Sequence, residues 1–96
     1  SQYPAVEHDL AIVVDNTVTC EDLERRITSA GGKLLEGVRL FDVYRDPVRI
    51  GAGKKSMAFA LTYRSDDHTL TSEEVEKAHQ KIVTKVCKGV NGEVRS

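Results

Sequence analysis

The chain has 96 residues, the size of one domain that can bury a single core without a metal or a disulfide. Apolar residues make up 40% and charged residues 30%, and no apolar run is long enough to span a membrane. Lysine and arginine total 14 against 15 aspartate and glutamate, so the formal net charge is −1. Proteins that hold nucleic acid through phosphates alone are usually strongly basic, so any RNA contact must depend on where the charges lie.

The first half of the chain is expected to form a strand, a helix and a second strand. Apolar residues alternate in the segment 8–15, which is typical of a strand. Thr19 followed by Asp22 resembles a capping box at a helix start, and the glycine pair 31–32 is expected to stop that helix. Residues 34–45 then form the second strand.

The second half repeats this order. Residues 55–64 predict a third strand, in which large side chains alternate with small ones. Thr71 followed by Glu74 is a second capping box, and Gly89 is expected to end the helix that it starts. A short final strand should follow at about residues 90–95.

The order βαββαβ predicts an α+β fold, the ferredoxin-like sandwich, with two helices on one face of a four-stranded antiparallel sheet. One domain covers residues 1–96, and residues 1–7 are expected to lead in from a preceding part of a longer chain. In the third strand the large side chains must face the helices, because the small set cannot fill a core. The expected core comprises Leu10, Ile12, Leu23, Ile27, Phe41, Met57, Phe59, Leu61, Val75 and Ile82.

The same alternation assigns the second strand to two faces. Phe41 and Val43 are expected to point inward. Leu40, Asp42 and Tyr44 then share the open face with the small side chains of the third strand. These small neighbours would let a flat group approach the sheet.

The segment 51–56, Gly-Ala-Gly-Lys-Lys-Ser, resembles a phosphate-binding loop only at first sight. Val48 stands where the first glycine of such a loop is required, and strands flank the segment in place of a strand and a helix. A hairpin loop is therefore expected.

Catalytic and metal-binding residues are not expected in this chain. His8, His68 and His79 are scattered over different elements without a neighbouring nucleophile, and His79 is expected on a helix surface. Cys20 and Cys87 lack metal-ligand spacing, so two reduced thiols are expected, at the same end of two antiparallel helices.

The open face remains as the candidate site. It is expected to hold Asp42 and Tyr44 opposite Ser56. Possible phosphate contacts border it, namely Arg39, Arg45, Arg49, Lys54 and Lys55. From the residues alone, RNA binding and packing against another domain are equally open alternatives.

Five blocks of the sequence, in order, carry a resemblance to a known family. They are Tyr3-Pro4-Ala5-Val6, Asp9-Leu10-Ala11-Ile12-Val13-Val14, Leu40-Phe41-Asp42-Val43-Tyr44, Gly53-Lys54-Lys55-Ser56 and Thr69-Leu70-Thr71-Ser72-Glu73-Glu74-Val75. Block by block, the chain resembles the ferredoxin-fold anticodon-binding domain that closes the β subunit of bacterial phenylalanyl-tRNA synthetases. The resemblance covers essentially the whole chain. Relatives commonly carry basic residues where this chain has Glu7 and His8, which weakens the expected positive field.

The resemblance implies a cytoplasmic parent enzyme that joins phenylalanine to tRNA(Phe) with ATP and magnesium, as an α2β2 assembly with its catalysis in the α subunit. It implies that this domain needs no cofactor and reaches the anticodon stem-loop. The family's RNA contacts correspond here to Asp42, Tyr44 and Ser56, and Arg95 is the candidate for a basic contact from the terminal strand. A protein-interaction module of the same fold, with no RNA contact, is the alternative.

Overall fold

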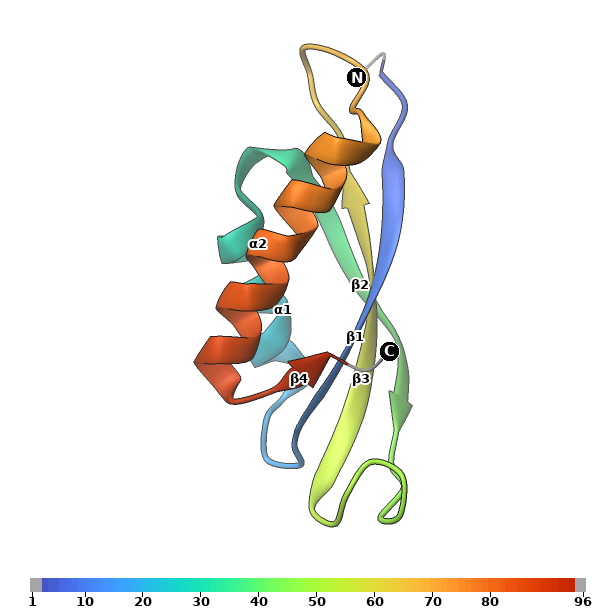
Figure 1. Cartoon of the computed structure of the whole chain (residues 1–96), viewed down its shortest axis with the longest axis vertical. Helices are drawn as coiled ribbons and strands as arrows, with labels where there is room; N and C mark the ends of the chain where they lie inside the picture. The colour runs from blue at the N-terminus through green and yellow to red at the C-terminus, as the bar shows by residue number, and fades with distance from the viewer. Residues whose placement is uncertain (1–2, 95–96) are drawn as a thin grey trace.

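The computed structural model describes residues 3–94 as one antiparallel sheet with two helices on one face (Figure 1). The strand order is β2-β3-β1-β4. The predicted ferredoxin-like βαββαβ sandwich is therefore confirmed. In the part of the chain described, neither helix is long and apolar enough to cross a membrane. The elements are β1 (Val6–Asp15), α1 (Cys20–Gly31), a 3-10 turn (Gly32–Leu34), β2 (Leu35–Tyr44), β3 (Lys54–Tyr63), α2 (Ser72–Val90) and β4 (Glu93–Val94).

Both helices begin where the threonine caps predict. The Thr19 hydroxyl accepts a hydrogen bond from the Asp22 amide at 3.1 Å. At the start of α2 the capping box is complete, because the Glu74 amide donates to the Thr71 hydroxyl at 3.2 Å and the Thr71 amide donates to the Glu74 carboxylate at 3.1 Å. Each cap satisfies amide groups that have no partner within the helix, a contribution of about 1 kcal/mol.

The end of α2 differs from the expectation that Gly89 stops the helix. The helix continues to Val90, and Asn91 follows with a φ of 54° in the left-handed conformation that ends it. The Gly92 amide then donates to the Cys87 carbonyl at 2.9 Å. A Cβ at position 89 would lie 2.6 Å from the end of the flexible Arg26 side chain, so the glycine leaves room for this guanidinium.

The core lies between the helices and one face of the sheet. The large side chains of β3 face the helices as predicted, and Phe59 is 0% exposed. Phe41 is wrongly assigned to the core by the sequence, since it is 47% exposed. The other nine predicted members are buried, namely Leu10, Ile12, Leu23, Ile27, Met57, Phe59, Leu61, Val75 and Ile82.

An irregularity in β2 explains the error at Phe41. In the pairing of β2 with β3, Leu40 lies opposite Phe59 and Asp42 lies opposite Ala58, so Phe41 is an extra residue in the strand. Such a bulge shifts the alternation of the side chains by one residue. Leu40, expected on the open face, consequently packs against the core, while Asp42 and Tyr44 keep the face that was predicted for them.

The two terminal segments also differ in extent from the prediction. β1 begins at Val6, two residues before the predicted start, and therefore includes Glu7. β4 is limited to Glu93–Val94, which pair with Val13 and Ile12 of β1. Arg95, the predicted RNA contact of the terminal strand, lies outside the described residues.

Candidate nucleic-acid interface

Three rows of side chains cross the open face of the sheet, each contributed by β2, β3 and β1. The pairing of the strands gives the rows Arg39–Ala60–Asp9, Asp42–Ala58–Ala11 and Tyr44–Ser56–Val13. Neighbouring rows are about 7 Å apart, since they are two residues apart along β3 and β1. Along β2 the bulge leaves Arg39 and Asp42 three residues apart in the sequence. Small side chains thus run down the middle strand, with Asp42 and Tyr44 beside them on β2.

The three residues expected to contact RNA differ in how far solvent reaches them. Asp42 is exposed and Tyr44 is half-buried. Ser56 is only 2% exposed, in the row between Tyr44 and Val13. Its hydroxyl is therefore covered in the free domain, whereas Asp42 and Tyr44 are accessible.

Asp46, which the sequence analysis did not single out, organises the loop beside Tyr44. One carboxylate oxygen accepts the Tyr44 hydroxyl at 2.9 Å. The other accepts the Val48 amide at 2.9 Å and the Arg49 amide at 3.1 Å. The Asp46 carbonyl accepts the amide of Ile50 at 2.8 Å. An Asp-Pro pair favours the start of a turn, so the sequence could have indicated the position of this turn. It could not have indicated the hydrogen bond between Asp46 and Tyr44.

The same loop is also tied to the turn after β1. The Asn16 side chain accepts a hydrogen bond from the Arg45 guanidinium at 3.2 Å, and the Asn16 amide donates to the Gly53 carbonyl at 2.8 Å. Gly51 and Gly53 have φ values of 120° and 74°, which favour glycine. The segment 51–56 is thus part of a hairpin connection, as predicted.

Four of the five predicted phosphate contacts are exposed, and one is not. Arg39 belongs to the first row of the open face, and Lys54 lies opposite Asp15 at the end of the sheet. Lys55 is only 8% exposed and lies opposite Val14, on the face covered by the helices. We therefore leave Lys55 out of the interface. The four exposed residues are Arg39, Arg45, Arg49 and Lys54.

A second cluster of polar rings, also missed by the sequence analysis, lies under α2 on the opposite face. The Tyr63 hydroxyl shares a hydrogen bond of 2.8 Å with Nδ1 of His79. The His8 ring lies 5.1 Å from the His79 ring, centroid to centroid. His79 is half-buried, which corrects the expectation that it lies on the helix surface, and burial followed by the charge of His8 lowers its pKa.

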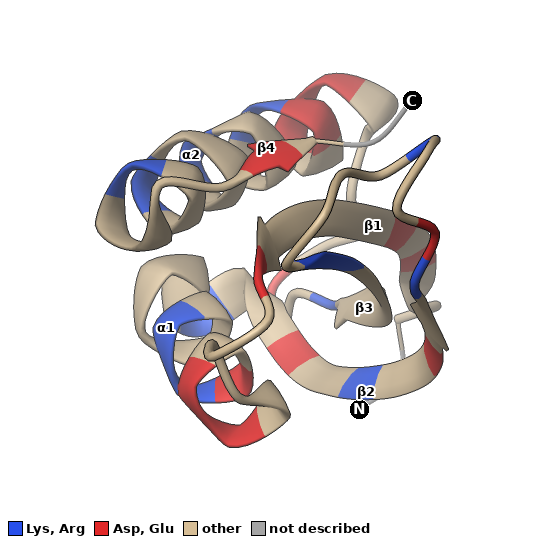
Figure 2. Cartoon of the chain, turned by 90° about the horizontal axis from the view of Figure 1, so that it is seen from below, with Lys and Arg blue, Asp and Glu red and all other residues tan. Residues whose placement is uncertain are grey.

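Positive charge gathers on the part of α2 that follows Glu76. Between Glu76 and Glu93 the sequence contains no carboxylate. Lys and Arg segments as well as Asp and Glu segments mark both helices and β2, while β1 carries Asp and Glu segments (Figure 2). Four exposed lysines follow α2 at near-helical spacing, namely Lys77, Lys81, Lys85 and Lys88.

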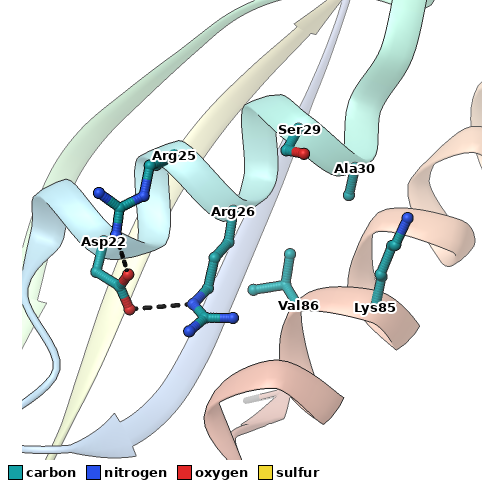
Figure 3. Close-up of a pocket in the computed structure, with 7 residues that line it drawn as sticks. All are labelled: Asp22, Arg25, Arg26, Ser29, Ala30, Lys85 and Val86. Atoms are coloured by element: carbon teal, nitrogen blue, oxygen red, sulfur yellow. Dashed lines mark hydrogen bonds and ion pairs between the residues drawn. The ribbon is translucent and has the colours of Figure 1, made fainter.

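A hollow of about 410 Å³ lies between the two helices, on the layer opposite the open face (Figure 3). Asp22 pairs there with Arg25 at 2.7 Å and with Arg26 at 3.1 Å. These pairs lower the pKa of Asp22, the bond to Arg26 most strongly. The Asp22 carboxylate thus pairs with both guanidinium groups in the hollow. All residues that line the hollow belong to α1 and α2, so it is not part of the candidate interface on the sheet.

Within residues 3–94, no group of three or more His, Cys, Asp or Glu side chains is placed to hold a metal ion. Cys20 and Cys87 are free thiols. Partial burial, and then the bond of Cys20 to Glu24, raise the pKa of Cys20 to about 11.

Comparison with known proteins identifies the family. The model of the family described as "Ferredoxin-fold anticodon binding domain" matches residues 1–95. The chain belongs to this family. The open face with Asp42 and Tyr44 is therefore the sheet face of an anticodon-binding domain.

Curated relatives of this anticodon-binding domain carry one common name, phenylalanine–tRNA ligase beta subunit. The chain is 45% identical over 94 residues to the protein of Clostridium tetani and 47% identical over 95 residues to that of Symbiobacterium thermophilum. It is 51% identical over 82 residues to the protein of Bacillus subtilis. These alignments cover 98%, 99% and 85% of this chain. They span only 12%, 10% and 10% of the relatives, so this domain corresponds to a small part of each.

Proposed function

We propose that this domain binds the anticodon stem-loop of tRNA(Phe) through the open face of its sheet. The observation that carries the proposal is the adjacency of two rows, in which exposed Asp42 and half-buried Tyr44 stand beside the small side chains of β3. Membership of the anticodon-binding family and the shared name of the relatives support the same assignment.

The first anticodon base offers the chemistry that Asp42 can recognise. Phenylalanine anticodons begin with guanine, whose Watson–Crick edge presents two adjacent N–H donors. A carboxylate accepts both, and adenine lacks that pair of donors at this edge. A fitting pair of hydrogen bonds of this kind contributes roughly 1–3 kcal/mol of discrimination between bases. Asp42 is therefore assigned to base specificity.

Tyr44 is assigned to affinity. Its ring lies one row from Asp42 on the same face, close enough to stack on a base of the same loop. Stacking of a base on an aromatic side chain contributes roughly 1–3 kcal/mol and is tolerant of base identity. Ser56, which is buried and lies opposite Tyr44, keeps the floor of the site small.

The parent of the domain is proposed from the relatives alone. We infer that it is the β subunit of a phenylalanine–tRNA ligase of the cytoplasm, paired with an α subunit in an α2β2 assembly. ATP and magnesium then act at the α subunit, and we propose no site for either in this domain. The domain's own contribution is RNA binding, without a catalytic group.

A test of the specificity assignment uses the reconstituted ligase with tRNA carrying guanine or adenine at the first anticodon position. Asp42→Asn should reduce the preference for guanine by about 5- to 100-fold in dissociation constant. Asp9→Asn is the matched control, because Asp9 is an exposed carboxylate on the same face, two rows from Tyr44. It removes the same charge and should leave the preference unchanged.

Two results would overturn the proposal. An unchanged guanine preference in Asp42→Asn would show that this carboxylate is not the reader. A titration in which the 96-residue chain and the ligase both fail to respond to an anticodon stem-loop would favour the protein-interaction alternative, with another domain on the open face.

A further inference from the structure

The side chain of Asp46 connects the proposed stacking residue with the loop that borders it. One carboxylate oxygen accepts a hydrogen bond from the Tyr44 hydroxyl at 2.9 Å, and the other accepts hydrogen bonds from the amides of Val48 and Arg49. Asp46 is itself half-buried. The Asp46 carboxylate therefore ties the Tyr44 side chain to the backbone of the loop.

We propose that Asp46 is a positioning residue for RNA binding, which acts by holding the Tyr44 ring in a stacking orientation through the tyrosine hydroxyl. This inference rests on the proposed function. It deepens that function by separating the two parts of Tyr44, because the ring contacts the RNA base while the hydroxyl is committed to Asp46 and not to the RNA.

The physical reason is preorganisation. A half-buried tyrosine on an edge strand can rotate about two side-chain bonds, and each alternative orientation must be given up when a base stacks on it. The bond to Asp46 removes that freedom before the RNA arrives. The loop bonds of Asp46, together with the bond of the Asn16 amide to the Gly53 carbonyl, hold the anchor itself in place.

The test is a double-mutant cycle in tRNA affinity, measured on the ligase that contains this domain. Tyr44→Phe keeps the ring and removes the hydroxyl, and Asp46→Ala removes the anchor. Each should weaken tRNA binding by about 2- to 10-fold, the range of one hydrogen bond. The double variant should bind about as weakly as Asp46→Ala alone, since that change already breaks the bond that Tyr44→Phe removes.

Two further variants separate positioning from loss of the loop. Asp46→Asn keeps an oxygen for the amides of Val48 and Arg49 and offers an NH₂ group to the tyrosine hydroxyl, so affinity should return to within about twofold of the unchanged protein. The preference for guanine over adenine should stay the same in every Tyr44 and Asp46 variant, since Asp42 is untouched.

The outcomes distinguish this inference from the proposed function. If Tyr44→Ala leaves tRNA affinity unchanged, the ring does not bind RNA and the proposed function fails at this residue. If Tyr44→Ala weakens binding but the losses of Tyr44→Phe and Asp46→Ala multiply in the double variant, the positioning role is overturned. The hydroxyl then contacts RNA directly, or Asp46 acts only through the loop.

Discussion

Replacing Phe59 with alanine tests the layer of side chains on which the candidate interface rests. The ring is 0% exposed and lies opposite Leu10 on one side and Leu40 on the other, in the centre of the sheet. Removing a fully buried phenylalanine ring costs about 3–5 kcal/mol, which combines lost burial with the cavity left behind. For a domain of this size the melting temperature should fall by roughly 15–25 °C.

Phe41 provides a matched control, because the chain contains two phenylalanines and alternation alone would place both in the core. Since Phe41 is 47% exposed, its replacement by alanine should cost only about 1 kcal/mol. Urea unfolding followed by circular dichroism gives both values from the shift of the midpoint at constant slope. Phe59→Leu, at about 1–2 kcal/mol, keeps the comparison measurable if Phe59→Ala does not fold.

Two results would refute this reasoning. A loss below about 1.5 kcal/mol for Phe59→Ala would mean that the ring is not enclosed as the strand pairing implies. Equal losses at the two phenylalanines would mean that β2 has no bulge and that Phe41 points into the core. Leu40 would then lie on the open face, as regular alternation predicts, while Asp42 and Tyr44 would keep that face.

Three further outcomes are expected. Lowering the pH from about 7 to about 5 should destabilise the domain, because the pKa of His79 is lowered in the folded state and the unfolded chain takes up a proton first. In urea unfolding, the stability of His79→Gln should depend less on pH than that of the unchanged protein. Thr71→Ala should cost about 1 kcal/mol and Thr69→Ala, before the helix, much less in the same assay. Cys20 and Cys87 should react slowly with iodoacetamide at neutral pH because both pKa values are raised, so rapid labelling of the folded protein would contradict their burial.

Local chemistry made several features readable from the sequence. Thr19 and Thr71 marked the helix starts because a hydroxyl at that position satisfies amides that the helix leaves unpaired. The size difference between the two sets of side chains in β3 decided which face the helices cover. Asp42 and Tyr44 were placed on the open face for the same reason.

The alternation of large and small side chains gave wrong predictions where the backbone of β2 departs from a regular strand. Leu40 packs against the core and Phe41 is exposed because one extra residue in β2 shifts the alternation, and a bulge leaves no mark in a two-residue pattern. Gly89 was predicted to end the helix, yet it lies inside α2, where it leaves room for the Arg26 guanidinium of α1. Lys55 was counted with the basic border, although its strand position turns it toward the helices.

The sequence by itself determined the order of elements, the helix caps and the side of the sheet that stays open, since each follows from contacts within a few residues or from side-chain volume. Tertiary structure alone decided which distant residues meet. It brought His8 and His79 together under α2 and set the β2 bulge against β3. It also bound Asp46 to Tyr44, although the two are only two residues apart, because the turn that reverses the chain directs the carboxylate back onto the strand.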